Sequence, residues 1–287
     1  MQRKNINLLS LDELATYSDW PARLLSIDFF EKKEKNHSEI IREFGNDKWG
    51  SLLDFFQNES SFSLLDVEEM EKDLNKITPC FDHNIGFYLS QSKKADLEVL
   101  DYYIGALSKY TKNASCLVEL GAGYGNKIFK LSENKSFKHL DLYAAEYTDT
   151  GCELISLVSK NINKDIQVGK CDFNNMTLSG IKIPKNAIIF TSYAVHYVPE
   201  LKSEFVKFLN QFKPIAVIHF EPCYEYFDAK TTYGLMCKRY MDLNGYTKNI
   251  ASSVQAGCKN IEASFISRKN IHGSNPFLPF SIIEWSP

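Results

Sequence analysis

Glycines at alternate positions are the most informative chemical feature of the sequence. Gly121, Gly123 and Gly125 follow the apolar run Cys116–Leu120 and precede a helical pattern, so the chain must turn sharply there. Glycines at such a turn let the backbone approach a ligand, because a Cβ atom would collide with it. Glu119 stands two residues before the first glycine, where a carboxylate pairs with an amino group but repels a pyrophosphate. The pattern therefore predicts a ligand that carries a positive charge.

Two further acids follow the next apolar runs. Glu146 ends the second run and is placed to accept hydrogen bonds from both hydroxyls of a ribose. Asp172 and Phe173 follow the third run, where the acid can accept from an adenine amino group and the ring can pack on the base. A nicotinamide dinucleotide is disfavoured, because its fingerprint places the third glycine one residue later than Gly125.

The elements that must position these residues change in character near residue 113. Residues 1–112 have helical periodicity, including an amphipathic segment at 92–110, and nothing in them alternates like a strand. From Ser115 onward, short apolar runs alternate with helical segments, which is typical of a parallel sheet with crossover helices. The expected strands are 116–120, 140–145, 166–168, 187–191 and 215–220, with a closing hairpin formed by 263–267 and 282–285.

The ordered set Glu119-x-Gly121-x-Gly123-x-Gly125, Glu146 and Asp172-Phe173 resembles the class I S-adenosylmethionine-dependent methyltransferases over about residues 113–287. The resemblance implies a Rossmann-like α/β fold with a seven-stranded, mostly parallel sheet and a reversed C-terminal strand. It implies S-adenosyl-L-methionine as cofactor and S-adenosyl-L-homocysteine as product. Residues 1–112 are then a helical N-terminal region and cap, and residues 113–287 a methyltransferase domain with a helical insertion at about 223–262. The expected cofactor-binding residues are Glu119, Gly121, Ala122, Gly123, Gly125, Glu146, Tyr147, Asp172, Phe173 and Ser192.

The segment after the fourth expected strand supplies the first catalytic candidate. It lacks the Asn/Asp-Pro-Pro-aromatic tetrad of methyltransferases that act on amino groups of bases and glutamine, and it resembles the small-molecule branch of the family. An imidazole with a pKa near neutrality beside the methyl donor can remove a hydroxyl proton, so we expect His196 to be the base. His219 and Glu221, on one face of the fifth strand, are the alternatives.

The insertion at 223–262 is rich in tyrosine, whose phenols bind polar acceptors such as sugars, while an arginine can hold a phosphate or carboxylate. The expected acceptor is therefore a hydroxyl of a sugar or phosphorylated metabolite. The chain also resembles methyltransferases of bacterial surface-polysaccharide and capsule modification, including those that methylate capsular phosphoramidate. N-methylation of a peptide or small amine, and a donor-binding module without catalysis, are the alternatives. The expected substrate-binding residues are Tyr88, Tyr193, Tyr197, Tyr226, Arg239 and Tyr240.

Composition limits the partners. The 287 residues carry a formal charge of -3, so no basic excess favours nucleic acid, and no apolar run approaches the ~18 residues of a membrane span. The start lacks the apolar stretch of a signal peptide, which predicts a cytoplasmic protein. The seven cysteines form no C-x-x-C pair, so we expect reduced thiols and no metal site. The aromatic N-terminal helices favour a homodimer.

Overall fold

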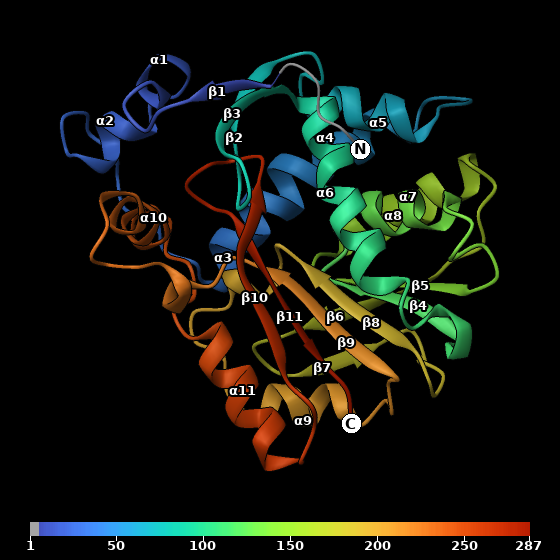
Figure 1. Cartoon of the computed structure of the whole chain (residues 1–287). Coiled ribbons are helices and arrows are strands. Elements are labelled where there is room, and N and C mark those ends of the chain that lie inside the picture. Colours follow the sequence, from blue (N-terminus) through green and yellow to red (C-terminus); the bar gives the residue numbers. More distant parts are fainter. Residues whose placement is uncertain (1–5) are drawn as a thin grey trace.

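A computed structural model of the chain describes residues 6–287, which form a sheet with helices on both faces (Figure 1). Within these residues the sheet has 11 strands in the order β1-β3-β2-β10-β11-β9-β8-β4-β5-β6-β7. Its five central parallel strands are β4 (Cys116–Leu120), β5 (Asp141–Glu146), β6 (Gln167–Asp172), β8 (Ile188–Ser192) and β9 (Ala216–Glu221). Strand β11 (Phe280–Trp285) lies antiparallel between β9 and β10 (Ile266–Gly273), which confirms the reversed C-terminal strand.

The expectation of a seven-stranded sheet after an all-helical N-terminal region is wrong. Three strands precede residue 113, namely β1 (Asn7–Leu9), β2 (Ile77–Asp82) and β3 (Gly86–Gln91), and β7 (Thr177–Ser179) extends the opposite edge. Pro79 lies within β2, and the sheet accommodates it because β10 pairs only with Phe81 and Asp82. Pro79 therefore removes no hydrogen bond from the pairing with β10.

Two apolar cores cover the two faces of the sheet, because side chains alternate along the central strands. In β4, Leu117 packs into the core shared with α6 (Ser92–Leu107), α7 (Asn126–Glu133) and α8 (Asp149–Asn161). Cys116, Val118 and Leu120 pack into the core on the other face. That second core is completed by α9 (Glu204–Asn210) and α11 (Ile250–Asn260) (Figure 1).

Part of the N-terminal region lies at the carboxyl edge of the parallel strands. The π-helical segment η1 (Ile41–Gly50) packs on α8, and it joins α3 (His37–Ile40) to α4 (Ser51–Phe56). A third apolar cluster joins Leu14 and Leu24 of the N-terminal segment to α10 (Thr232–Leu243). The remaining helices are α1 (Leu14–Tyr17), α2 (Trp20–Leu24), α5 (Leu64–Glu71), η2 (Thr111–Asn113), η3 (Val195–Tyr197) and η4 (Tyr224–Tyr226).

The expected insertion at 223–262 contains α10 and α11. Both sides of residue 113 contribute strands to the same sheet, so the division into two domains there stays a prediction.

All seven cysteines are free thiols. In the described part of the chain, no group of three or more His, Cys, Asp or Glu side chains is arranged to hold a metal ion. No helix among residues 6–287 is long and apolar enough to cross a membrane.

Candidate ligand-binding site

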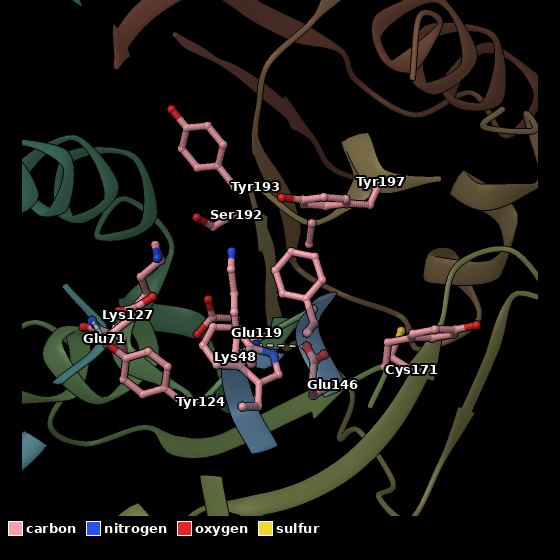
Figure 2. A pocket seen from close by; sticks show the side chains of 18 of the residues that line it. Lys48, Glu71, Glu119, Tyr124, Lys127, Glu146, Cys171, Ser192, Tyr193 and Tyr197 are labelled. Carbon is pink, nitrogen blue, oxygen red and sulfur yellow. Dashed lines mark hydrogen bonds between the residues drawn. The ribbon is translucent and has the colours of Figure 1, made fainter. Parts of the chain in front are cut away.

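A cavity of about 300 Å³ lies at the carboxyl ends of β4, β5 and β8, beneath η1 (Figure 2). This is the edge at which open α/β sheets bind ligands. The glycine turn after β4 forms its floor, and η1 and α6 supply opposing walls. Its lining includes Phe44, Lys48, Trp49, Glu71, Tyr103, Glu119, Gly121, Ala122, Gly123, Tyr124, Lys127, Glu146, Tyr147, Cys171, Phe173, Ser192, Tyr193, Ala194 and Tyr197.

The turn after β4 requires its glycines. Gly121 has φ +74°, and a Cβ there would stand 2.3 Å from the Cβ of Ala194. Gly123 has φ +57°, and its Cβ would stand 2.9 Å from the Trp49 ring. Both positions line the cavity, as does Ala122, whose amide donates to the Ala145 carbonyl at 3.1 Å. The backbone is thus bare where a ligand would lie on it.

Gly125 has a different role from the one expected. It does not line the cavity but forms the left-handed N-cap of α7, with φ +83°. A Cβ at this position would stand 2.8 Å from the Phe129 ring. The third glycine therefore allows α7 to begin, while the first two form the cavity floor.

Glu119 is a buried carboxyl group at the end of β4, with 1% of its surface exposed. It accepts a hydrogen bond from the Ile128 amide of α7 at 3.0 Å. Burial raises the pKa of Glu119 to about 8, although the nearby Lys127 partly opposes the rise. A cationic group beside it would restore its charge, which fits the amino group that the sequence predicted for this position.

Glu146 is fixed against the glycine turn. One of its oxygens accepts from the Gly123 amide at 2.9 Å, and the other lies 3.4 Å from both the amide and the hydroxyl of Thr148. Burial raises the pKa of Glu146, and these hydrogen bonds oppose the rise. The carboxylate is thus held at the cavity wall, where its remaining lone pairs are available to hydroxyl donors.

The end of β6 matches the expectation only in part. Phe173 lines the cavity, with its ring edge against Phe205. Asp172 does not line the cavity, because its carboxylate is bound within its own turn. It accepts from the Asn174 amide at 2.8 Å and from the Asn175 amide at 3.1 Å. Tyr147 lines the neighbouring wall.

Hydroxyl groups line the cavity at the end of β8. Ser192 Oγ lies 2.6 Å from the phenol oxygen of Tyr103, which α6 contributes. Tyr193, with φ +49°, lines the cavity and donates from its hydroxyl to the Leu278 carbonyl at 3.1 Å. The Tyr197 ring also lines it, with the Lys35 ammonium 4.8 Å from the ring centre. Burial raises the pKa of Tyr103 well above its usual value, so this phenol stays neutral.

The expected bases do not line the cavity. Glu221 is buried behind the β8 loop and accepts from the amides of Ala194 at 3.0 Å and Val195 at 3.1 Å. His196 Nδ1 lies 3.1 Å from Glu221. Burial opposes the charge of Glu221, but these hydrogen bonds and His196 outweigh it, so its pKa is lowered. The pair therefore holds in place the loop that carries Ala194 to the cavity.

His219 is misplaced for a base. It is fully buried on the face of β9 that packs toward α9, and both ring nitrogens contact neighbouring strands. Nδ1 lies 3.0 Å from the Thr191 hydroxyl, and Nε2 accepts from the Trp285 indole at 3.2 Å. Burial lowers the pKa of His219 to about 4, so the ring is neutral near pH 7. The expectation that His219 is a candidate base is therefore wrong, because its ring links β9 to β8 and β11 inside the core.

Four expected acceptor-binding residues also lie outside the cavity lining. Tyr88 is buried on β3, where its hydroxyl donates to Glu98. Tyr240 packs against Trp20 with ring centres 4.3 Å apart, and Arg239 donates to the Ser26 hydroxyl at 2.7 Å. Tyr226 contacts Lys269, whose ammonium lies 5.0 Å from its ring centre. The tyrosine-rich insertion thus binds other parts of the chain, largely because α10 packs on the N-terminal segment.

Sequence reasoning missed the residues that η1 places over the glycine turn. Phe44, Lys48 and Trp49 all line the cavity, and Trp49 contacts the position of Gly123. The apolar stripe that includes Phe44 indicated a helix, but no pattern in the sequence specifies which part of the molecule that helix covers. The contact between η1 and the turn joins segments far apart in the sequence, so it is decided by tertiary packing.

The strand order, the reversed β11 and the glycine turn after β4 together define a Rossmann-like methyltransferase fold. No protein-family profile and no curated protein matches the chain. Among solved structures, it is similar to magnesium protoporphyrin IX methyltransferase from Synechocystis PCC 6803 with bound SAH. That protein is 12% identical, with a TM-score of 0.52 over 87% of this chain and 99% of that one.

Geranyl diphosphate C-methyltransferase from Streptomyces coelicolor A3(2) is another structural neighbour, solved with Mg²⁺, geranyl diphosphate and S-adenosyl-L-homocysteine. It is 10% identical and covers 85% of this chain and 98% of its own, with a TM-score of 0.49. The similarity to the Synechocystis protein concerns the fold alone, and the function must be argued from the site.

Proposed function

We propose that this protein transfers a methyl group from S-adenosylmethionine to a small polar acceptor. The observation that carries the proposal is the convergence of three features on one cavity: the bare glycine turn, the Glu119 carboxyl group and the Glu146 carboxylate. Each matches a different part of a positively charged nucleoside. Structural similarity to methyltransferases supports the same assignment at the level of the fold.

The residues present fit this donor. Glu119 would pair with its amino group and Glu146 with its ribose hydroxyls, while Phe173 and Tyr147 would flank the adenine. The Trp49 ring, which packs on Gly123, would cover the donor from the side of η1. When bound, S-adenosylmethionine supplies an electrophilic methyl group on a sulfonium sulfur. The protein must then align the acceptor and exclude water.

Alignment is the chief contribution of this chain's own residues, and alignment supplies up to about 7–11 kcal/mol in well-oriented systems. Phe44 and Trp49 close the cavity against solvent, and Ser192 and Tyr103 present neutral hydroxyls that can orient a polar acceptor. His196 and Glu221 act as positioning residues, because their hydrogen bonds fix the loop that carries Ala194. Removing that pair should shift the cavity wall.

For the acceptor, we propose a hydroxyl of a sugar or phosphorylated metabolite, as in the modification of bacterial capsule or surface polysaccharide. The size of the cavity, about 300 Å³, is in keeping with a small molecule, and its hydroxyl-lined wall suits a polar one. A cytoplasmic location would give the protein access to such metabolites.

The proposal is tested by incubating the full chain with methyl-labelled S-adenosylmethionine and separate pools of sugars, phosphorylated metabolites, small amines and peptides. We expect label in the sugar or phosphorylated-metabolite pool. Label only in the amine or peptide pool would replace O-methylation with N-methylation. Donor binding without product in any pool would indicate a binding module. Absence of donor binding would overturn the proposed function altogether.

A further inference from the structure

Lysines around the cavity differ in how they are neutralised. Lys72 lies 2.7 Å from the Asp96 carboxylate, and Lys130 pairs with the buried Glu68. Lys48 has no comparable partner in the described part of the chain. Its ammonium is 3.9 Å from Glu43 and 4.5 Å from the centre of the Phe44 ring.

The carboxylate nearest to Lys48 is already engaged. Lys35, which is buried, pairs closely with the other oxygen of Glu43. Figure 2 shows the Lys48 side chain extended into the pocket, with its ammonium on the side where Ser192 and Tyr193 lie. This cation therefore lines the same cavity as Ser192 and Tyr193 and leaves a positive charge for an anionic partner.

A second observation at the next residue also points to a ligand. Trp49 is 8% exposed and lines the same cavity, and its buried indole Nε1 has no hydrogen-bond partner among residues 6–287. A buried N–H group without a partner costs free energy, so such groups are normally satisfied by protein, water or a ligand. The indole can only donate, so its partner must be an acceptor.

We propose that Lys48 and Trp49 form an oxyanion-binding site that selects acceptors carrying a phosphate or carboxylate group. The inference rests on the proposed function and deepens it, because it assigns the charge of the acceptor and the residues that read it. An ammonium and an N–H donor from adjacent residues complement an oxyanion, which accepts hydrogen bonds at several oxygens. A neutral sugar would leave the Lys48 charge unmatched.

The test follows the indole N–H resonance of Trp49 by NMR, in full-length protein saturated with S-adenosyl-L-homocysteine. The chain has three tryptophans, so Trp49→Phe assigns the signal. Inorganic phosphate and acetate are titrated separately, which distinguishes a phosphate-bearing from a carboxylate-bearing acceptor. We expect a saturable shift of this resonance with one of them. Lys48→Met should weaken that anion at least about tenfold, and Lys48→Arg should restore most of the affinity.

Lys32→Met is the matched control, because Lys32 is exposed, lies outside the cavity lining and changes the net charge equally. It should leave the anion titration unchanged. The inference is overturned if neither anion shifts the Trp49 signal saturably, or if Lys48→Met binds as tightly as the parent. Calorimetry with S-adenosyl-L-homocysteine distinguishes the two proposals. If this ligand binds but neither anion has an effect, only the oxyanion-binding site is overturned. If this ligand does not bind, the proposed function is overturned.

Discussion

The two halves of the cavity edge differ in how their residues are held. At the ends of β4 and β5, the groups that face the cavity belong to the strand–helix turns themselves, and Glu146 binds the glycine turn directly. At the ends of β8 and β9, the hydrogen-bonded pair His196–Glu221 lies behind the wall, and α6 contributes Tyr103 to the lining beside Ser192. The half that we propose for the donor is thus built mainly by local turns, with the Trp49 ring of η1 added over Gly123. The half that we propose for the acceptor depends more on distant segments.

The largest effect is expected at the centre of the donor half. Gly121→Ala introduces a Cβ that would stand 2.3 Å from Ala194, at a backbone φ of +74°. We expect loss of the thermal shift produced by S-adenosyl-L-homocysteine, which corresponds to an affinity loss of about 100-fold or more. Gly105→Ala on α6 is the control, because a Cβ there would meet no atom of the described residues within 4 Å. Undiminished donor binding by Gly121→Ala would contradict the account of the turn.

Glu146→Ala should come next. It removes the carboxylate that binds the Gly123 amide, so both the loop and the proposed ribose contact are lost. We expect donor affinity to fall about tenfold to 100-fold, since hydrogen bonds to charged groups contribute about 1.5–3 kcal/mol. Calorimetry measures this directly. Glu133→Ala, an exposed acid at the end of α7, should behave like the parent. Equal affinities for the Glu146 and Glu133 variants would remove Glu146 from the site.

Glu221→Gln probes the other half. The Glu221 carboxylate accepts hydrogen bonds from the backbone amides of Ala194 and Val195 and contacts His196. Glutamine replaces one acceptor oxygen with an N–H₂ group, which cannot accept a hydrogen bond from these N–H donors. We expect the free energy of unfolding to fall by about 3 kcal/mol or more, because several N–H groups donate to this buried carboxylate and a hydrogen bond to a charged group contributes about 1.5–3 kcal/mol. Donor affinity should fall less than in Glu146→Ala. Normal stability with abolished turnover would instead identify Glu221 as catalytic.

How much could be predicted from the sequence follows the same division. Gly121, Gly123 and Glu146 line one cavity, and their proximity could be predicted because glycine spacing and the position of an acid at a strand end depend on a few consecutive residues. Their role in binding a cofactor stays a prediction. His219 could not be excluded by alternation along β9. Alternation put it opposite Phe220, but only the packing of α9 and β11 shows that its face is core. The acid at position 172 was predicted to face the ligand and instead binds its own turn.

The N-terminal region was the hardest to predict. Helical stripes located η1 approximately, but the contact of Trp49 with Gly123 depends on how that segment folds back over the sheet. The β2–β3 hairpin was not predicted, because a proline such as Pro79 disfavours a strand. The structure tolerates Pro79 because its position is not paired with β10. In both cases the sequence does not show which distant segment the residues pack or pair with, because local patterns do not specify tertiary neighbours.

The smallest effect concerns the titration of Glu119. Its pKa rises from 4.5 to about 8 in the folded chain, so between those values the folded state holds a proton that the unfolded state releases. The stability associated with this group is therefore present at low pH and lost as the pH rises toward 8. Urea unfolding at pH 5.5 and 8.5 should show the parent losing at least about 1.4 kcal/mol more than Glu119→Gln, the equivalent of one pKa unit. Parallel losses in both proteins would contradict the assignment.

The most direct measurement is isothermal titration of the full chain with S-adenosyl-L-homocysteine and, separately, with NAD. If the nucleoside binds against the backbone of residues 121–123, beside Glu146, S-adenosyl-L-homocysteine should bind at a single saturable site and NAD should produce no heat. No measurable heat with S-adenosyl-L-homocysteine, or saturable heat with NAD alone, would contradict the assignment of this cavity to a methyl donor.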